Sequence, residues 1–376
     1  MRVGVNLCYF RQGGVGGSEV YVRELLGALL ETQGIDLVLY GSETNLVSLA
    51  GTARCSAKII SRSPYNDASR ILDENLRLTR HVRKDRIDLL WSPANFTPLI
   101  GLDKPQVATI HDLQHRELWR FFSPARWLAR ELLFRRTVSC CSRLIAISTY
   151  TAEHIKRAFN VPPDRIRVVH EGCGLGERLG RDGQRVRAEK PLVGCRPYCY
   201  YPAMLAPHKN HEILLRALAI LRKEGTSIDL VLTGKRSDDW NRLSALASRL
   251  GVADLVRHKG FVTRAEVLAL MSNAECLVFP SQFEGFGLPP LEAMALGVPV
   301  IASNRTSLPD IVGDAGILVD PNDAAAWAAA ISTVRDPRVR ADLIDRGYSN
   351  VKRFNWARCA KETADVFTEA AGQRPN

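Results

Sequence analysis

The sequence lacks the features of a membrane-spanning or secreted chain. No run of about 18 apolar residues occurs, so no transmembrane helix is predicted. The first ten residues, MRVGVNLCYF, enter a strand-like pattern without an apolar signal core or a small-residue cleavage site. The nine cysteines are odd in number and scattered, and the adjacent pair Cys140 and Cys141 suits no disulfide framework. We therefore expect a cytoplasmic protein whose cysteines are structural thiols.

Several motifs of catalysis and cofactor binding are also missing. The stretch QGGVGGSE (12–19) has Glu19 where a dinucleotide-binding G-x-G-x-x-G that starts at Gly14 needs its last glycine. His111 and Asp112 are adjacent, but no G-x-S-x-G serine elbow accompanies them. No D-x-D lies between strand-like runs to chelate a diphosphate through a metal. These absences weigh against an NAD-dependent dehydrogenase and a hydrolytic triad, and we predict neither a metal nor a cofactor.

What the sequence does have is an excess of basic residues on a globular composition. The 51 Lys and Arg residues outnumber the 40 Asp and Glu residues, which gives a formal charge of +11. This excess favours anionic partners, namely nucleic acid, phosphate esters or an acidic membrane surface, and charge alone does not choose among them. The 376 residues, of which 46% are hydrophobic and 24% charged, are enough for two ordinary domains.

Short apolar runs and helical patterns alternate along the whole chain, which predicts two doubly wound α/β domains. Most of the runs are apolar on both faces, as in parallel strands covered by helices on both sides. Helical periodicity fills the gaps, for example at 18–31, 211–224 and 343–370, and the polar stretch 177–191 is predicted to be the linker. The strand-like runs lie at 2–8, 35–41, 87–93, 106–112, 143–148, 166–172, 198–203, 228–234, 275–281, 299–304 and 316–321.

Polar residues follow several of these runs, at the edge where open parallel sheets bind ligands. They are HD (111–112), TGK (233–235), SQFEG (281–285) and SN (303–304). Because both halves carry such loops, we expect the loops of the two domains to face a shared central cleft.

The stretch FPSQFEGFGLPPLEAMALGVPVIASN (279–304) carries the most specific pattern. It predicts a strand at 275–281, a tight turn that contains Gly285, Gly287, Pro289 and Pro290, and a helix at 291–296. The backbone amides of this turn, which precede a helix, are suited to bind an anion or hydroxyls.

Two carboxylates flank this turn. Glu284 and Glu292 are placed to accept hydrogen bonds from the hydroxyls of a sugar or a ribose. The alternative is a helix-start acid and a solvated helix acid without a ligand.

Two further stretches carry candidate site residues. In APHKNHE (206–212), Lys209 lies at the mouth of a strand and opens a helix, which suits a diphosphate. His208 and His211 either join this site or are surface histidines at the helix start. In TIHDLQH (109–115), His111 either hydrogen-bonds a sugar hydroxyl or caps the next helix.

The segment 117–136, ELWRFFSPARWLARELLFRR, interleaves aromatic residues with five arginines. This mixture suits an anionic membrane surface. Nucleic acid is not expected because no recognised nucleic-acid motif accompanies the segment. The alternative is that the aromatics are core residues and the arginines form a solvated face.

The segment 283–323, which begins FEGFGLPPLEAMALGVPVIASN, closely resembles the signature of the GT-B-fold retaining glycosyltransferases of family 4, which use nucleotide-sugar donors. The resemblance extends over nearly the whole chain through GGVGGSEVYVRELLGAL, ATIHDLQH, LIAISTYTAEHI, RIRVVHEG, YPAMLAPHKNHEILLRAL and GFVTRAEVLALMSNAECLVFPS. It implies an acceptor domain at 1–185 that is completed by a crossing helix at about 356–372, and a donor domain at 190–355.

The resemblance also implies roles for the candidate residues. Glu284 and His111 would lie near the donor sugar, Glu292 would bind the ribose, and Lys209 would bind the phosphates. The backbone of Gly285, Phe286, Gly287 and Leu288 would hold sugar hydroxyls and phosphate.

Glycines near the N-terminus have an implied role as well. Gly16 and Gly17 would let the backbone approach the donor phosphates, although a purely structural turn is the alternative. The sequence departs from the family where an arginine often precedes the lysine, because Ala203 and Met204 stand there. His208, Lys235 and Arg236 are the candidates to supply the missing cation.

The resemblance therefore implies an enzyme that moves a hexose from a nucleotide sugar to a saccharide or lipid-linked acceptor in cell-surface polysaccharide synthesis. GDP-mannose is our first candidate for the donor. A glycoside hydrolase that uses the two glutamates, an NAD-dependent dehydrogenase and a non-catalytic nucleotide-sugar sensor are the competing hypotheses.

Overall fold

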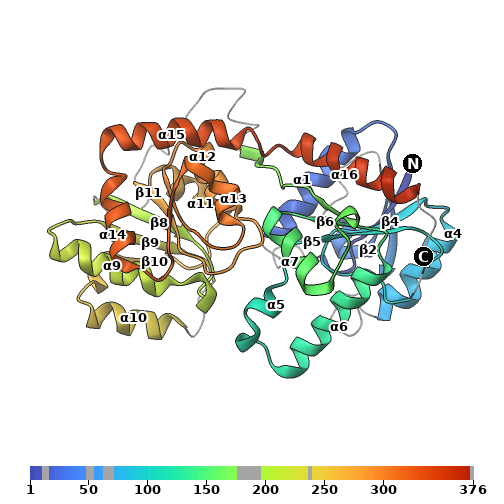
Figure 1. Ribbon diagram of the computed structural model, residues 1–376, viewed down its shortest axis with the longest axis horizontal. Helices are drawn as coiled ribbons and strands as arrows, with labels where there is room; N and C mark the ends of the chain where they lie inside the picture. The colour runs from blue at the N-terminus through green and yellow to red at the C-terminus, as the bar shows by residue number, and fades with distance from the viewer. Residues whose placement is uncertain are drawn as a thin grey trace. The chain divides into compact units, whose positions relative to one another are not determined.

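The computed structural model describes residues 1–10, 17–47, 55–61, 72–100, 102–175, 196–235 and 239–372 (Figure 1). The chain divides into two compact units, and each is described by itself. Unit 1 comprises Met1–Gly172 and Phe354–Asn376, and unit 2 comprises Cys173–Arg353. The linker predicted at 177–191 lies outside the described residues.

Unit 1 is built on a seven-stranded parallel sheet with the order β3-β2-β1-β4-β5-β6-β7. Its strands are β1 (Arg2–Asn6), β2 (Asp36–Ser42), β3 (Cys55–Ser61), β4 (Leu89–Ser92), β5 (Gln106–Ile110), β6 (Arg143–Ala146) and β7 (Ile166–Val168). Its helices are α1 (Gly17–Glu31), α2 (Glu43–Val47), the π-helix η1 (Glu74–Leu78), α4 (Thr79–Lys84), α5 (Gln114–Glu117), η2 (Trp119–Phe121), α6 (Pro124–Cys140), α7 (Thr149–Phe159), η3 (Pro163–Arg165) and α16 (Trp356–Ala371).

Unit 2 is built on a six-stranded parallel sheet with the order β10-β9-β8-β11-β12-β13. Helices α9, α10 and α14 lie on one face of this sheet, and α12, α13 and α15 lie on the other (Figure 1). The strands are β8 (Tyr198–Pro202), β9 (Asp229–Thr233), β10 (Val256–His258), β11 (Cys276–Phe279), β12 (Val300–Ser303) and β13 (Ile317–Val319). The helices are η4 (Pro207–Lys209), α9 (His211–Lys223), α10 (Asp239–Arg249), η5 (Ala253–Leu255), α11 (Arg264–Ser272), α12 (Leu288–Ala295), α13 (Leu308–Val312), η6 (Gly313–Ala315), α14 (Ala324–Thr333) and α15 (Pro337–Val351).

Each of the predicted strand-like runs contains a strand, so the expected doubly wound α/β class is confirmed. Two strands were not predicted, β3 and β10, and each forms an edge of its sheet. Their sequences, CSAKIIS and VRH, carry polar residues among the apolar ones. An edge strand has only one neighbouring strand and needs less apolar surface, so neither strand is revealed by a run of apolar residues.

The strand order reverses once in each sheet, between β1 and β4 in unit 1 and between β8 and β11 in unit 2. In open parallel sheets, ligands bind beyond the carboxyl ends of the strands at this switch point. In unit 2, the segment with Lys209 follows β8 and the segment with Glu284 follows β11. The topology therefore brings these two candidate residues to the same point of the sheet.

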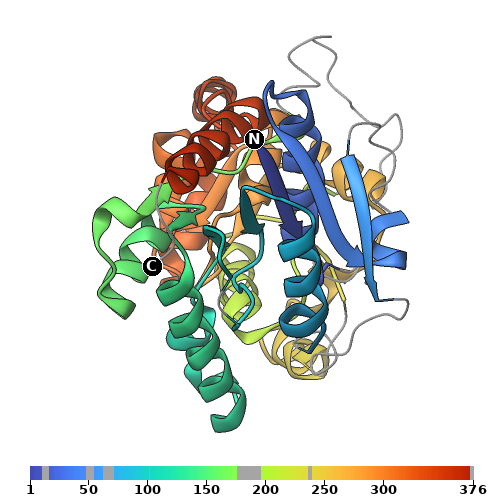
Figure 2. The ribbon, with the colours of Figure 1, turned by 90° about the vertical axis from the view of Figure 1, so that its right-hand side faces the viewer.

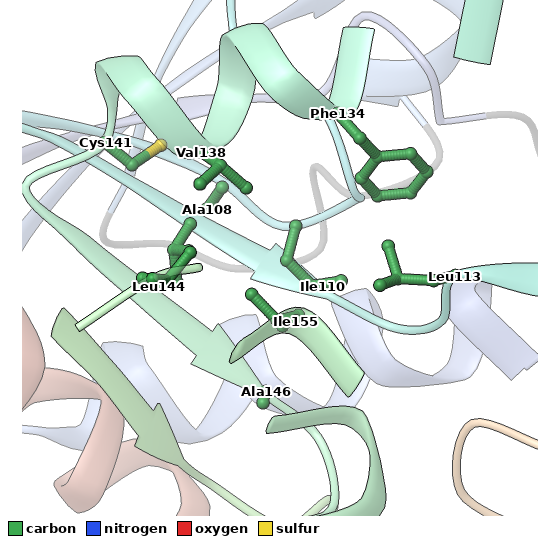
Figure 3. Packing of buried hydrophobic residues seen from close by; sticks show 10 residues of the cluster. Ala108, Ile110, Leu113, Phe134, Val138, Cys141, Leu144, Ala146 and Ile155 are labelled. Atoms are coloured by element: carbon green, nitrogen blue, oxygen red, sulfur yellow. The ribbon is translucent and has the colours of Figure 1, made fainter. Parts of the chain in front are cut away.

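The core of unit 1 fixes one side of the long helix α6. Phe134, Val138 and Cys141, at the end of and just after α6, pack with residues of β5 and β6 and with Ile155 of α7 (Figure 3). The part of α6 nearer its start extends, with α5 and η2, away from the strands of unit 1 (Figures 1 and 2). The core therefore holds α6 by its C-terminal half.

Residues 343–370, predicted as helical, form the end of α15 and then α16. Asn355 caps the start of α16, and its side-chain oxygen accepts a hydrogen bond from the backbone N–H of Arg358. Within unit 1, the ring of Phe367 packs 5.4 Å from that of Trp91. The half-buried carboxylate of Glu369 in α16 also forms ion pairs with arginines of β6 and β7. The last helix is therefore an integral part of unit 1.

Candidate functional site

The segment between β11 and α12 forms the centre of the candidate site in unit 2. The helix begins at Leu288, earlier than the predicted 291, so Pro289 and Pro290 belong to its first turn and not to the preceding loop. Proline is tolerated there because the first N–H groups of a helix have no intrahelical acceptor. Gly287 precedes the helix with a φ of +123°, and a Cβ at this position would lie 2.9 Å from Cδ2 of Leu308. Glycine is therefore required here both by the backbone and by the packing.

Lys209 and Glu284 form an ion pair at the switch point of the sheet. The Lys209 Nζ donates to Glu284 Oε1 at 2.6 Å, and both side chains are largely shielded from solvent. Nζ also lies 5.9 Å from the centre of the Phe279 ring. The structure thus brings together a cation suited to a phosphate and a carboxylate suited to hydroxyls.

The segment that carries Lys209 is anchored at several points. Asn210 adopts the left-handed conformation with a φ of +54°, and its Nδ2 donates to the Pro321 carbonyl at 2.6 Å. The Tyr201 hydroxyl donates to the Lys209 carbonyl at 2.9 Å and lies 3.0 Å from the Ser281 hydroxyl. These contacts fix the backbone of Lys209 against the loop that carries Glu284.

The loop after β12 holds the Glu284 backbone from the other side. The Glu284 N–H donates to Thr306 Oγ1 at 3.1 Å, and the Ser307 hydroxyl donates to the carbonyls of Glu284 and Phe286 at 3.0 and 2.6 Å. Thr306 has a φ of +54°, which is unusual for a β-branched residue. The sequence analysis did not single out Thr306 or Ser307, although they closely follow SN (303–304), one of the polar pairs at the end of a predicted strand.

Glu292 is not the solvated helix acid that the alternative hypothesis required. It is only 7% exposed, and both of its carboxylate oxygens accept from Arg264, from Nη1 to Oε2 at 2.9 Å and from Nη2 to Oε1. Burial alone would lower the pKa of Arg264, but the hydrogen bonds and the charge of Glu292 raise it overall. The sequence analysis did not single out Arg264. Its position beyond the carboxyl end of β10 would have indicated it, but β10 itself was not predicted.

The two histidines beside Lys209 differ from each other. His211 is buried and packs 4.8 Å from the Tyr201 ring, so the hypothesis of a surface histidine is wrong for this residue. Burial, and then the positive charge of Lys209, lower the pKa of His211 to about 3, so the ring is neutral. His208 is half-buried, and its carbonyl accepts from the Gln282 N–H at 2.8 Å.

The end of β9 meets the segment in which the family's arginine is missing. The Leu205 N–H donates to the Lys235 carbonyl at 3.5 Å, which places Lys235 beside Ala203 and Met204. The side chain of Lys235 is exposed. Arg236, the other candidate for the missing cation, lies outside the described residues.

In unit 1, His111 is paired with a glutamate that sequence reasoning had not singled out. His111 Nδ1 lies 3.5 Å from Glu171 Oε1, and Nε2 donates to the Pro93 carbonyl at 2.8 Å. Burial by itself would lower the pKa of His111, but Glu171 and the Pro93 carbonyl raise it overall. Asp112 instead accepts from the backbone N–H of Gln114 at 3.0 Å. Glu171 follows β7, so the carboxyl-end rule would have found it.

The glycine-rich stretch near the N-terminus is only partly described. Gly17 begins α1, and no atom lies within 4 Å of the position that a Cβ would take there. Gly16 lies outside the described residues.

No cluster of three or more His, Cys, Asp or Glu residues that could hold a metal ion occurs in the described part of the chain.

Comparisons with known proteins match both halves of the chain. The family model described as Glycosyltransferase Family 4 matches residues 15–175, and the one described as Glycosyl transferases group 1 matches residues 183–350. The O-antigen chain mannosyltransferase B of Escherichia coli is 31% identical over 288 residues, which span 76% of this chain and 75% of that protein. The D-inositol 3-phosphate glycosyltransferase of Arthrobacter sp. (strain FB24) is 28% identical over 96% of this chain and 92% of that protein.

Solved structures share the fold over nearly the full length. The sucrose-phosphate synthase of Thermosynechococcus elongatus superimposes with a TM-score of 0.75 at 21% identity, covering 98% of each chain. The Anabaena protein HepE, solved in complex with UDP and glucose, gives a TM-score of 0.71 at 18% identity, covering 98% of this chain and 100% of that one. Together with the relatives and family models above, these matches identify the chain as a GT-B-fold enzyme of the family 4 glycosyltransferases.

Proposed function

We propose that this enzyme transfers a hexose, with mannose as the first candidate, from a nucleoside-diphosphate sugar to a saccharide or lipid-linked acceptor. The pathway we propose is the synthesis of a cell-surface polysaccharide, supported by the similarity to an O-antigen chain mannosyltransferase. The observation that carries the proposal is the Lys209–Glu284 pair at the switch point of unit 2. Unit 2 would bind the donor and unit 1 most of the acceptor.

The proposed donor site uses the charges at the ends of β8 and β11. Lys209 would donate to the diphosphate, while Glu284 would accept from hydroxyls of the sugar. Backbone N–H groups of Gly285, Phe286, Gly287 and Leu288 would complete the contacts in unit 2. We also propose that Gly16 and Gly17 let the backbone approach the donor phosphates. Glu292 would accept from the ribose. Among the described residues, His208 and Lys235 are the candidates for the second cation. His208 directly precedes Lys209, and Lys235 is hydrogen-bonded through its carbonyl to the segment after β8.

We propose that transfer retains the configuration of the anomeric carbon without a covalent sugar–enzyme intermediate. The acceptor hydroxyl would attack from the face that the diphosphate leaves, so that the new C–O bond forms as the bond to phosphate breaks. The acceptor's proton would pass to the departing phosphate oxygen, whose charge Lys209 stabilises. A sugar adduct trapped on a carboxylate would contradict this mechanism.

We propose that neither a metal ion nor a cofactor takes part. The support is that a lysine and the backbone N–H groups before α12 lie where a diphosphate would need positive partners. Activity that disappears with EDTA and returns with a divalent cation would contradict this part of the proposal.

The proposed contact of His111 with the donor sugar requires a change in the hydrogen bonds of its ring. Its Nε2 proton already goes to the Pro93 carbonyl, so a sugar hydroxyl would have to replace that acceptor. Its other nitrogen faces Glu171. The pairing favours a positively charged ring, which would help to stabilise negative charge on the donor.

We propose that the segment 117–136 makes a peripheral contact with the cytoplasmic face of an anionic membrane. Four of its apolar side chains are more than half exposed, and exposed arginines accompany them. The apolar side chains would enter the interface while the arginines contact acidic headgroups. None of the helices in the described part of the chain is both long and apolar enough to span a bilayer. The apolar residues are Trp119, Phe121, Leu128 and Leu132, and the arginines are Arg120, Arg126, Arg135 and Arg136.

A thermal-shift screen against GDP, UDP, ADP, dTDP and their sugars tests the proposed donor site. One nucleotide family should stabilise the enzyme, by about 2.7 kcal/mol at 100 times the dissociation constant, with or without EDTA. Lys209→Ala should weaken binding about 10-fold or more because a charged hydrogen bond is lost. Lys223→Ala, an exposed change at the other end of α9, should bind like the unchanged enzyme. Stabilisation by none of these ligands would contradict the proposal.

The His111–Glu171 pair predicts a pH dependence of stability. The pKa of His111 is higher in the folded than in the unfolded chain, so its stabilising effect is complete below about pH 6.5 and is lost as the pH rises through the folded-state value. Glu171→Gln should lower the free energy of unfolding at pH 6 and reduce its fall between pH 6 and 9, as measured by urea unfolding. Glu153→Gln, an exposed control in α7, should leave the pH profile unchanged. Equal pH profiles for Glu171→Gln and the unchanged enzyme would show that the pair does not set this dependence.

Flotation with vesicles tests the membrane contact. The enzyme should float with phosphatidylcholine–phosphatidylglycerol vesicles at low salt and not with phosphatidylcholine alone. Replacing Arg120 and Arg126 together by glutamine should weaken partition by about 2 kcal/mol, or roughly 30-fold. Replacing Trp119 and Phe121 by serine should also weaken it, whereas Phe261→Ser, which changes an 82% exposed residue of unit 2, should not. Absence of flotation with the anionic vesicles would rule the contact out.

A further inference from the structure

The carboxylate of Glu292 is held by a single side chain in the described part of the chain. Glu292 lies within α12 and is 7% exposed, yet among the described residues only Arg264 donates a hydrogen bond to its carboxylate. A carboxylate buried to this degree is unfavourable unless a cation and hydrogen bonds compensate its charge. The orientation of the Glu292 carboxylate therefore depends on Arg264.

Arg264 is itself held by a well-defined helix start. It is the first residue of α11, directly after Thr263, whose hydroxyl accepts from the Glu266 N–H at 3.3 Å. The Glu266 carboxylate accepts in return from the Thr263 N–H at 2.7 Å, which completes a capping box. The backbone position of Arg264 is thus fixed before its side chain meets Glu292, and the planar guanidinium fixes the plane of the carboxylate.

The pair leaves capacity for a ligand on both partners. A carboxylate has about four lone-pair positions, and the two bonds from Arg264 use one on each oxygen. Each oxygen can still accept a hydrogen bond from a hydroxyl. The Arg264 side chain is 53% exposed, so the pair lies at the edge of solvent and can be reached by a ligand. Tyr200, whose pKa burial raises to about 12, is neutral nearby and supplies no competing charge.

We propose that Arg264 is a positioning residue, which orients Glu292 so that its carboxylate accepts hydrogen bonds from the two ribose hydroxyls of the donor nucleotide. This inference rests on the proposed function, which gives Glu292 its role at the ribose. Arg264 would act through Glu292 and would need no contact with the sugar that is transferred.

Calorimetry with nucleotides that have or lack the ribose hydroxyls separates this role from a general structural one. The probes are GDP, UDP and ADP, each with its 2′,3′-dideoxy form. The unchanged enzyme should bind one ribonucleotide about 10-fold or more tightly than its dideoxy form. Arg264→Ala should weaken binding of that ribonucleotide by a similar factor and bind the dideoxy form as the unchanged enzyme does. Arg264→Lys should restore part of the difference.

A control arginine is present in the same unit, and its acidic partner, Asp229, is also paired with Arg196. Arg257 is 42% exposed and donates to Asp229, a carboxylate that is 1% exposed and lies at the opposite, amino end of β9. Arg257→Ala should therefore preserve the preference for the ribonucleotide, although it also removes an arginine from a buried acid. Should Arg264→Ala fail to fold, Arg264→Lys decides by the same comparison.

Three results would overturn the inference. Equal weakening of the ribonucleotide and the dideoxy form by Arg264→Ala would indicate a structural role only, and unchanged binding would indicate no role. Equal binding of both forms by the unchanged enzyme would show that Glu292 does not bind the ribose hydroxyls. In the first two cases the proposed donor site stands, and in the third its Lys209–Glu284 part stands without the ribose contact. Binding of none of the three ribonucleotides would overturn the proposed function as well.

Discussion

The ion pair between Lys209 and Glu284 is the contact on which the arrangement of the site depends. The two residues are far apart in the sequence, and they meet because β8 and β11 are parallel neighbours at the point where the strand order reverses. Segments that leave adjacent parallel strands in opposite directions cannot fill the space between them. The anchors from Tyr201, Ser281, Thr306 and Ser307 then hold both segments at this edge. The sheet topology places the site, and these hydrogen bonds give it its geometry.

The electrostatics of unit 2 show a second regularity. Each of the two glutamates near α12 has its own cation, Lys209 for Glu284 and Arg264 for Glu292. A shielded carboxylate is unfavourable without such a partner, so each pair compensates a charge whether or not a ligand is bound. A nucleotide sugar would then enter a site whose charges are already balanced, and its phosphates and hydroxyls would share partners that the protein holds in position. In this sense the proposed donor site would be preorganised.

Much of this could be predicted from the sequence, because the signals are local. Apolar runs located every central strand, and the segment 283–323 identified the family. The edge strands β3 and β10 were missed because they are short or partly polar. Arg264 and Thr306 were missed because each joins the candidate site only through a partner in a distant segment, and a sequence pattern does not contain that pairing. His211 likewise gave no sign that the fold would bury it.

If Lys209 binds the second phosphate of the donor nucleotide, as we propose, the enzyme should distinguish nucleoside diphosphates from monophosphates. We expect calorimetry to show that the unchanged enzyme binds the diphosphate of its nucleotide about 10-fold or more tightly than the monophosphate. Lys209→Ala should abolish most of this difference while leaving the monophosphate affinity nearly unchanged. Equal weakening of diphosphate and monophosphate binding by Lys209→Ala would show instead that Lys209 supports the fold and does not bind the phosphate.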